Sequence, residues 1–510
     1  MALARVRAVA VLGVEGHLVE VEADLANGLP RMTLIGLPDA SLHEARDRVR
    51  AAVVNSGHRW PDRRITVGLF PATLPKAGSG FDLAMAVAVL CAASVVPAQA
   101  VARRVFIGEL ALDGRVRAVP GVLPAVLAAA GAGVERVVVP VDNAAEAALV
   151  PGARIEPAAD LAGVLAVLRG KAQAPGVPPA ASTPDVGETA GDLAEVAGQS
   201  RGRLAVEVAA AGGHHLFMQG PPGSGKTMLA DRLPGLLPPL DHSAALEVTA
   251  IHSVAGILPA RCPLLTRPPY RSPHHTATPA ALVGSGSAAV RPGLASQAHC
   301  GVLFLDEAPE FARQSLDALR QPLESGAIEI ARARVTARFP ARFQLVLAAN
   351  PCPCSRARGS GDVGCECPSM VRRRYLARLS GPLLDRIDIQ VALAAPSRAE
   401  LRADAGRAEP SALVAARVAQ ARARSEARLA GTPWQTNAQV PGPALRRLWP
   451  LPPRVTALAE RAFERGLLTA RGLDRVLRMA WTFTDLAGQA VPGPSQLGAA
   501  LDLRLPGWAA

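Results

Sequence analysis

The segment Gly220–Thr227, GPPGSGKT, constrains the fold of this chain more than any other feature. It follows the short apolar run LFMQ, which predicts a buried strand, and it precedes a helical pattern. Glycines at this place let the backbone curl, so that its N–H groups face phosphate at the start of a helix. Lys226 adds a positive charge for the β- and γ-phosphates, and Thr227 offers a hydroxyl to Mg²⁺. The pattern predicts an α/β domain that binds ATP through Gly220, Pro221, Pro222, Gly223, Ser224, Gly225, Lys226 and Thr227.

A second motif, GVLFLDE at residues 301–307, supplies the carboxylates that such a loop requires. Four apolar residues predict a buried strand, and the acidic side chains follow where it ends. Asp306 is expected to hold the Mg²⁺ shell, and Glu307 is expected to polarise the attacking water. A lone apolar run ending in Asp-Glu is common in proteins. The pairing with the phosphate loop is what makes the functional interpretation favoured here.

A third strand is predicted over 343–349, and it ends in Asn350. A polar side chain at that place reaches the γ-phosphate and orients water. Asn followed by Pro351 also favours a simple turn. We expect the catalytic role, because this strand comes directly after the strand that carries the carboxylates.

Regular patterns divide the rest of the chain into regions. Residues 171–192 lack aromatic residues and any hydrophobic period, which predicts a linker. Strand-like segments (64–69, 105–107, 136–140) alternate with Ala-rich helical ones (82–93, 121–130) before it, and a second α/β region follows it to about residue 393. Helical spacing then predicts an all-helical tail with helices near 413–429, 455–465 and 472–486.

Positive charge is concentrated after the linker. The chain carries a net charge of +12, and residues 1–192 hold 18 basic and 19 acidic side chains against 37 and 24 in residues 193–510. The asymmetry favours a polyanionic partner such as DNA, although an Arg-rich composition with only three lysines is an equally simple explanation. Aromatic residues make up only 3% of the chain, so binding to DNA would rest on phosphate charge and be sequence-independent.

The arginines gather most densely in residues 331–378, on both sides of Asn350. That segment contains ten arginines against only Asp362 and Glu366. We expect phosphate contacts there, whereas pairing with acidic groups between subunits is the alternative. The ten are Arg332, Arg334, Arg338, Arg342, Arg356, Arg358, Arg372, Arg373, Arg374 and Arg378.

The order of these motifs resembles that of AAA+ ATPases, and four further blocks are similar to the magnesium-chelatase-like YifB/ComM family. The blocks are RSPHHTATPAALVG (271–284), GVLFLDEAPEF (301–311), NPCPC (350–354) and LSGPLLDRIDI (379–389). The resemblance implies an AAA+ core with an insertion in its second helix, which suits the 79 residues between Thr227 and Asp306. It also implies a motor for DNA branch migration or strand separation, in recombination or natural transformation, that works on single-stranded or branched DNA.

Two arginines take roles from this resemblance. Arg386, in LLDRID, matches an arginine finger that reaches the γ-phosphate of a neighbouring subunit, and Arg471, in TARGLDR, resembles the sensor-2 arginine of a helical lid. A surface arginine paired with Asp385 or Asp388, and a solvated helix face, are the respective alternatives. A finger requires a neighbour, so the resemblance implies a homo-oligomer, usually a hexamer.

The N-terminal region resembles the proteolytic domain of Lon in residues 74–86 and 107–140. The position of the Lon nucleophile is Gly80 here, and that of its general-base lysine is Leu123, while Ser79 is one residue short. A nucleophile without its base is inert. The resemblance therefore implies a retained fold without proteolysis, in which Asp82 and Glu109 cap or pack.

A cysteine cluster follows Asn350. Cys352, Cys354, Cys365 and Cys367 form two C-x-C pairs, and four thiolates can close a tetrahedral Zn²⁺ site. Structural zinc pairs usually have two or more intervening residues, so a loop of reduced thiols is an equal alternative. His274 and His275 have no cysteine or carboxylate at ligand spacing, and we interpret them as residues of the insertion loop.

These observations predict four regions: a Lon-protease-like α+β domain (1–170), a linker (171–192), an AAA+ core (193–393) and a helical lid (394–510). Seven cysteines, an odd number, argue for a reducing cytoplasm, and no apolar run reaches the roughly 18 residues that span a bilayer. Two other functions are open: a magnesium-chelatase-type motor for metal insertion, and an ATP-dependent protease, which Gly80 and Leu123 disfavour.

Overall fold

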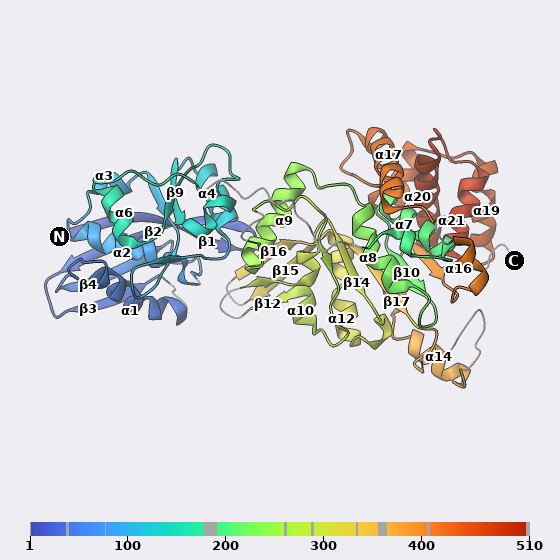
Figure 1. The fold of residues 1–510 in the computed structure, drawn as a ribbon, viewed down its shortest axis with the longest axis horizontal. Coiled ribbons are helices and arrows are strands. Elements are labelled where there is room, and N and C mark those ends of the chain that lie inside the picture. Colours follow the sequence, from blue (N-terminus) through green and yellow to red (C-terminus); the bar gives the residue numbers. More distant parts are fainter. Residues whose placement is uncertain are drawn as a thin grey trace.

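The computed structural model describes residues 2–36, 40–76, 78–177, 191–259, 263–286, 290–332, 335–354, 365–404 and 408–505. The described chain is elongated, with a sheet domain at the N-terminal end and a helical bundle at the C-terminal end (Figure 1). Residues 178–190, in the middle of the predicted linker, lie outside the described part.

A seven-stranded mixed sheet forms the N-terminal region, in the order β3-β4-β2-β1-β5-β8-β9. β1 pairs antiparallel with β2, whereas β1, β5, β8 and β9 run parallel. In β2 the residues Val19, Val21, Ala23 and Leu25 are buried in alternation with more exposed ones, which is the period of a strand with one covered face. The strands are β1 (Ala2–Leu12), β2 (Glu15–Ala26), β3 (Arg31–Ile35), β4 (Arg64–Phe70), β5 (Arg104–Phe106), β8 (Arg136–Pro140) and β9 (Arg154–Ala158).

Helices cover this sheet, and α2 (Asp82–Ala92) is buried along its whole length. The α2 sequence, DLAMAVAVLCA, forms a helix without a polar face, and such a helix fits an interior position. The predicted helices at 82–93 and 121–130 end within a residue of α2 and α4. The remaining elements are α1 (Ala40–Asn55), α3 (Ala98–Val101), α4 (Val122–Gly131), α5 (Ala144–Ala147), α6 (Leu161–Leu168) and the β6–β7 pair (Glu109–Leu110, Val116–Arg117).

A second, fully parallel sheet of five strands forms the centre of the molecule, in the order β11-β14-β17-β10-β18. Strand β17 lies between β10 and β14 in the sheet, although it follows both of them in sequence. β14 and β17 are buried at every position, because helices cover both faces of a parallel sheet. The strands are β10 (Leu216–Gln219), β11 (Tyr270–Arg271), β14 (Val302–Leu305), β17 (Gln344–Ala349) and β18 (Ile389–Ala392).

Helices and two small hairpins connect these strands. The β12–β13 hairpin stands between the short helices α10 and α11, and the β15–β16 hairpin follows α13. α9 begins at the Asp241 side chain, which accepts the Ala244 N–H, and ends at Gly256 in the left-handed conformation. The elements are α7 (Ser200–Gly212), α8 (Lys226–Leu236), α9 (His242–Ala255), α10 (Pro279–Val283), β12 (Gly284–Ser285), β13 (Arg291–Pro292), α11 (Leu294–Gln297), α12 (Arg313–Ala318), α13 (Arg320–Ser325), β15 (Ala327–Arg332), β16 (Val335–Pro340), α14 (Ser369–Leu376) and α15 (Gly381–Leu384).

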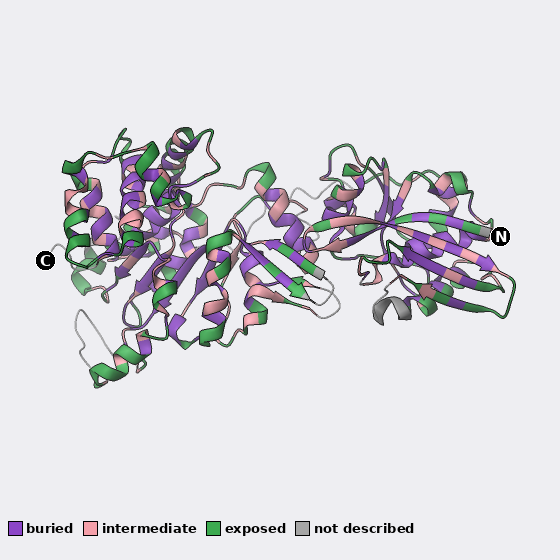
Figure 2. Cartoon of the chain, turned by 180° about the vertical axis from the view of Figure 1, so that it is seen from behind, coloured by how far each residue is buried: buried purple, intermediate pink, exposed green. Residues whose placement is uncertain are grey.

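The C-terminal region is helical, as the spacing of its apolar residues predicts. α20 buries Val476, Met479 and Ala480, which return at helical spacing, and the Thr469 side chain caps its start. Buried residues line the inner faces of these helices, and they also fill the seven-stranded and the five-stranded sheet (Figure 2). The helices are α16 (Arg398–Asp404), α17 (Ser411–Leu429), α18 (Gly442–Leu448), α19 (Pro453–Glu464), α20 (Ala470–Ala487) and α21 (Pro494–Arg504).

The N-terminal region contacts the central one at two places. Ala250 of α9 belongs to the core that β5, β8 and α4 form, and the Gly121 N–H donates to Ser253 of the same helix. At the second place, the turn between β1 and β2 lies against β16. Gly13 is required there, because its φ is +64° and a Cβ would lie 2.4 Å from the Arg338 carbonyl oxygen.

Candidate functional site

The loop between β10 and α8 has the curled geometry that its glycines predict. Gly223 and Gly225 adopt φ of 76° and 81°, a region that other residues rarely enter. A Cβ on Gly220 would lie 2.6 Å from both the Leu393 carbonyl oxygen and the Ser224 hydroxyl. The loop therefore depends on glycine at all three positions, and it ends where α8 begins, so the first N–H groups of that helix are available to an anion.

Lys226 lies inside this loop, with 8% of its surface exposed. Its Nζ donates to the carbonyl oxygens of Gly220 at 2.7 Å and Pro221 at 3.0 Å, and to Asn350 Oδ1 at 3.2 Å. Burial lowers the pKa of Lys226, while the charges of Asp306 and Glu307 oppose that shift. The ammonium group is thus held on protein oxygens at the place where a phosphate would supply better ones.

Thr227 and Asp306 meet across the site. The Thr227 hydroxyl donates to Asp306 Oδ2 at 2.8 Å, and Asp306 Oδ1 accepts the Glu307 N–H at 2.8 Å. A hydroxyl and a carboxylate side by side are the oxygen ligands that Mg²⁺ prefers in proteins. The two residues, 79 positions apart in sequence, fit the magnesium role that the sequence assigned to them.

Glu307 follows at the end of β14 with half of its side chain exposed. Its φ of 50° is unusual for a residue with a side chain. Its carboxylate Oε2 lies 3.5 Å from Nδ1 of His275, a contact that the sequence analysis did not foresee. The exposed carboxylate is available to a water molecule in front of the phosphate loop.

Asn350 stands in the middle of the site. Because β17 is inserted between β10 and β14, Asn350 emerges between the phosphate loop and the carboxylates, and it is 8% exposed. The sequence placed it one strand beyond the carboxylates, and the fold returns that strand to the centre. Its Oδ1 accepts a hydrogen bond from Lys226, so the two side chains lie side by side. The catalytic roles of Glu307 and Asn350 stay predictions.

Arg386 lies at the opposite edge of the same sheet. It comes three residues before β18, at the amino end of a strand that runs parallel to β10, whereas Lys226 follows the carboxyl end of β10. Four strand residues separate the two edges by about 13 Å. Arg386 pairs with Glu324 and donates to the Pro382 carbonyl oxygen. These partners differ from Asp385 and Asp388, which the alternative interpretation as a surface arginine had predicted.

Arg471 lies beside Arg386 rather than beside Lys226. Its Nη1 is 3.4 Å from Asp385 Oδ2, and 69% of its side chain is exposed. Both arginines line a cavity of about 1170 Å³ between the core and the C-terminal helices, which Lys226 does not line. The geometry brings the two predicted arginines together and keeps both away from the phosphate loop of their own chain.

Asp388 ties the C-terminal helices to the core near these arginines. Its carboxylate contacts Nδ1 of His214, before β10, at 3.2 Å, and Nη1 of Arg475, on α20, at 3.1 Å. Burial opposes the ionised form, but the hydrogen bond with His214 and the arginine charges outweigh it and hold the pKa of Asp388 well below its usual range. This link could not be predicted from the sequence, because a buried ion pair has no signature in residue spacing.

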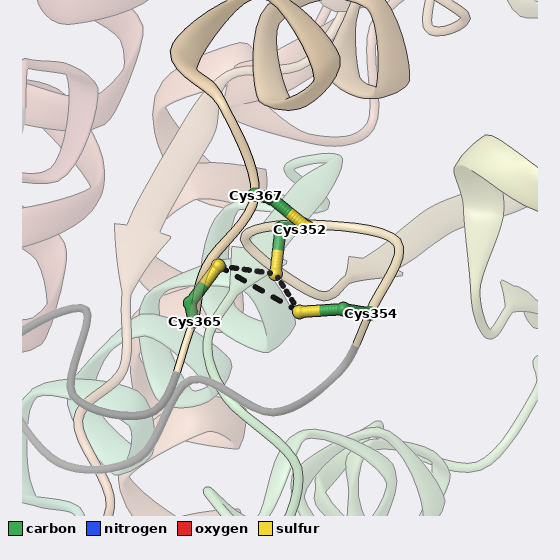
Figure 3. A group of neighbouring side chains, drawn as sticks. All are labelled: Cys352, Cys354, Cys365 and Cys367. Atoms are coloured by element: carbon green, nitrogen blue, oxygen red, sulfur yellow. Dashed lines mark hydrogen bonds between the residues drawn. The ribbon is translucent and has the colours of Figure 1, made fainter.

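The four cysteines converge as the sequence allowed. Their sulfurs all lie within 4.8 Å of one another, and those of Cys352, Cys354 and Cys365 point toward a common centre (Figure 3). Sulfurs around one Zn²⁺ stand roughly 3.8 Å apart, from a Zn–S bond of about 2.3 Å. The closest contacts here are 3.0, 3.3 and 3.6 Å. Burial raises the pKa of Cys352 to about 12, so without a metal this side chain would be a neutral thiol.

The arginines of residues 331–378 divide into two groups in space. Arg338 and Arg342 lie by the β15–β16 hairpin, near the N-terminal region, whereas Arg372, Arg373 and Arg374 lie on α14, at the other end of the core (Figure 1). A concentration in sequence is therefore not one surface. Arg342 pairs with Glu247, and Arg378 with Glu310. Arg334, Arg356 and Arg358 fall outside the described residues.

At the two positions that the Lon dyad would occupy, the N-terminal region carries no Ser–Lys pair. Leu123 is fully buried in an apolar core, and Gly80 offers no side chain. The Ser79 hydroxyl is bonded to Glu109, and Asp82 pairs with Arg48 at 2.9 Å. Burial raises the pKa of Asp82 to about 6, which fits a packing residue at the start of α2.

None of the described helices combines the length and the apolar character that a membrane crossing needs.

Comparison with known proteins places these features in a common framework. Family models match most of the chain: "Magnesium chelatase, subunit ChlI" over residues 192–401, "Subunit ChlI of Mg-chelatase" over 21–143, and "Magnesium chelatase, subunit ChlI C-terminal" over 408–504. Part of the chain is also similar to Lon protease of Rhizobium meliloti, at 32% identity over 27% of this chain and 18% of Lon.

Full-length relatives extend this similarity. Rv2897c of Mycobacterium tuberculosis is 52% identical over 99% of both chains. YifB of Escherichia coli is 40% identical over 95% of this chain and 94% of YifB. Competence protein ComM of Haemophilus influenzae is 40% identical over 99% of this chain and 98% of ComM.

Proposed function

Because this chain belongs to the magnesium-chelatase-like ATPase family of YifB and ComM, we propose that it is an ATP-driven motor that acts on DNA. The observation that carries the proposal is the convergence of Lys226, Thr227 and Asp306 at the carboxyl edge of the central sheet. Family membership accounts for the ATPase and for its use of ATP and Mg²⁺. The DNA substrate, the oligomer and the role of each residue go beyond it.

The proposed hydrolysis takes place at one edge of the sheet. The phosphate loop and Lys226 would hold the β- and γ-phosphates, and Thr227 and Asp306 would hold Mg²⁺, which would neutralise charge that develops on the phosphates. Glu307 accepts a hydrogen bond from the attacking water, and Asn350 keeps that water in line with the γ-phosphate. Lys226 then exchanges its bonds to loop carbonyls and Asn350 for bonds to phosphate.

The remaining charge is supplied by a neighbouring subunit. Arg386 cannot reach its own phosphate loop across the sheet, and Arg471 stands beside it at the same edge. Both side chains can therefore serve a nucleotide only on another copy of the chain. An arginine aimed at the developing charge typically speeds phosphoryl transfer by 10³–10⁵-fold. The positions of these arginines favour a ring of identical subunits, and six is the number that the family resemblance implies.

DNA is the polymer that best fits the charge of the ATPase region. The excess of basic residues lies entirely after residue 192, and α14 presents Arg373 and Arg374 on its exposed surface, away from the body of the core (Figure 1). The name of ComM connects that relative to competence. Contacts to phosphate alone give binding that is independent of sequence and falls steeply with salt. Branch migration or strand separation in the cytoplasm is the proposed outcome.

Zn²⁺ is the proposed metal of the cysteine cluster. Four thiolates are a closed structural set, and the four sulfurs already lie within 4.8 Å of one another. The cluster lies between Asn350 and α14, so the metal would fix the path from the phosphate sensor to the basic helix. Protein purified without chelator is expected to hold about one zinc per chain, and folded, active protein without metal would contradict the proposal.

The decisive experiment measures ATPase activity with single-stranded, duplex and branched DNA at low salt. Stimulation by at least one form, together with ATP-dependent strand displacement or branch migration, is expected. ATPase activity that is indifferent to every form, with no DNA remodelling, would contradict the DNA role and leave the ATPase intact.

A charge-neutralised variant locates the contact. Replacing Arg372, Arg373 and Arg374 by glutamine is expected to weaken DNA binding and flatten its salt dependence, with ATP binding unchanged. A matched control replaces three exposed arginines of the α19 region, Arg454, Arg461 and Arg465. Size-exclusion chromatography with ATP identifies the alternative, in which the α14 arginines pair between subunits and their loss disrupts assembly.

A further inference from the structure

The segment after β11 runs alongside the segment after β14. The two strands are parallel neighbours, with Tyr270 opposite Val302 and Arg271 opposite Leu303. The same offset of 32 residues, continued past the ends of both strands, places His275 opposite Glu307. Strand pairing therefore brings a histidine, which the sequence suggested was only a loop residue, to the catalytic carboxylate.

Neighbouring contacts fix the loop that carries His275. The Ala277 carbonyl oxygen accepts the Ser315 hydroxyl at 2.9 Å, and the Thr278 side chain caps α10. The ring of His274 lies against that of His275, with centroids 4.1 Å apart, and His274 itself bonds to Thr276. Residues before and after His275 in the sequence therefore hold its loop in place.

Glu307 is less constrained than the loop it faces. Its side chain is half exposed, and its backbone has a positive φ that the Asp306 carboxylate supports by accepting the Glu307 N–H. Within the described part of the chain, His275 is the one residue that forms an ion pair or hydrogen bond with the Glu307 carboxylate. A general base acts only within hydrogen-bond reach of its proton, so the direction of this carboxylate matters for the rate.

We propose that His275 is a positioning residue for Glu307. Its ring N–H donates to the Glu307 carboxylate, and this bond restricts the carboxylate to orientations in which its other oxygen faces the attacking water. The inference rests on the proposed function, because it assumes that Glu307 activates water. It adds a residue from the β11–α10 loop to a site otherwise built from the ends of β10, β14 and β17.

The test compares three variants by steady-state ATPase kinetics. His275→Ala is expected to lower kcat about tenfold with KM for ATP within twofold, because nucleotide contacts are left in place. His275→Asn keeps an N–H donor near the position of Nδ1 and is expected to recover most of that loss. His274→Phe keeps the stacked ring and is the matched control, with kcat expected to equal that of the unmodified protein.

A double variant separates positioning from simple stability. In a Glu307→Gln background, His275→Ala is expected to cause no further loss, since the carboxylate it would orient is gone. The inference is overturned if His275→Ala keeps full kcat, if His275→Asn loses as much as His275→Ala, or if His274→Phe loses as much as either. Normal turnover in Glu307→Gln alone would instead refute the proposed role of Glu307 itself.

Discussion

Two buried lysines, one in each α/β region, lie in different surroundings, and Lys226 has the neighbours that the proposed nucleotide site requires. Lys76, in the N-terminal region, is 1% exposed and donates to the carbonyl oxygens of Gly36 and Pro71. Lys226 is 8% exposed and also bonds to loop carbonyls. Burial lowers the pKa of both side chains, but only at Lys226 do nearby carboxylates oppose the shift.

The difference lies in what surrounds each ammonium group. Lys226 is surrounded by the charges of Asp306 and Glu307, a glycine loop and a helix start, which are the groups that the proposed Mg²⁺ and phosphate site needs. Around Lys76, backbone carbonyls satisfy the donor, and the nearby Ser79 hydroxyl is bonded to Glu109. A buried lysine therefore marks an active site only when its neighbours leave room for a ligand of opposite charge.

The largest expected contrast comes from removing each lysine. Lys226→Ala is expected to abolish tight ATP binding, because the phosphates lose their charged partner. Lys76→Met is expected to leave ATP affinity unchanged and to act only on thermal stability, since it removes the donor to the Gly36 and Pro71 carbonyl oxygens. Calorimetric ATP titration of both variants checks the contrast. Equal loss of binding would show that the N-terminal region shapes the nucleotide site.

The two carboxylates, Glu307 and Glu109, are expected to differ next. Glu307→Gln is expected to bind ATP and lose on the order of 100-fold or more in kcat, since positioned proton acceptors contribute about 10²–10⁴-fold. Glu109→Gln is expected to hydrolyse ATP normally. Single-turnover measurements with pre-bound ATP separate the two effects. Normal turnover by the Glu307 variant would mean that another group activates water.

A mixing experiment tests whether the ATPase region is complete within one chain. Lys226→Ala and Arg386→Ala are each expected to be nearly inactive alone. Mixed, they are expected to recover part of the ATPase activity, because some seams then combine an intact phosphate loop with an intact arginine. Arg386→Ala with full activity on its own would refute the finger role, and a Lys226→Ala and Glu307→Gln mixture is the control that should not recover.

The smallest effect is expected where the two regions touch. Glu146 is buried near Ser253 of α9, its Oε2 has no hydrogen-bond partner among the described residues, and burial raises its pKa. The folded state therefore favours the protonated Glu146 carboxyl. Its contribution to the free energy of unfolding is fully present below the pKa of the unfolded state and is lost as pH rises through the pKa of the folded state. Glu146→Gln should remove that loss and stabilise the protein at pH 7 by about 1 kcal/mol. Thermal unfolding at pH 5 and 7 measures it.

Local patterns in the sequence predicted much of this molecule. The strand at 136–140 and the strand ending at Ala349 were predictable because apolar runs and turn residues mark their ends. The phosphate loop was predictable because glycine, lysine and threonine at fixed spacing have one common use. Sequence identity of 40% to YifB and to ComM confirms the family that the longer motifs indicated.

Relations across the sheet could not be predicted in this way. The insertion of β17 between β10 and β14, which brings Asn350 to the centre, depends on strand order, and no local pattern encodes it. The His275–Glu307 contact depends on the pairing of β11 with β14. The arginines of residues 331–378 looked like one group because the chain between them folds back through a buried strand, which separates neighbours in sequence.

The placement of Lys226 and Arg386 at opposite ends of parallel strands gives each subunit a direction. A contact that brings the arginine of one copy to the phosphate loop of another joins two unlike surfaces, so such contacts can only run head to tail. A series of this kind either closes on itself or grows without limit. A copy with a defective phosphate loop or a defective arginine still has the other surface intact. It can therefore enter an assembly and inactivate the contact that depends on its defective surface. Modest expression of such a copy beside the intact protein would then silence more sites than its own number.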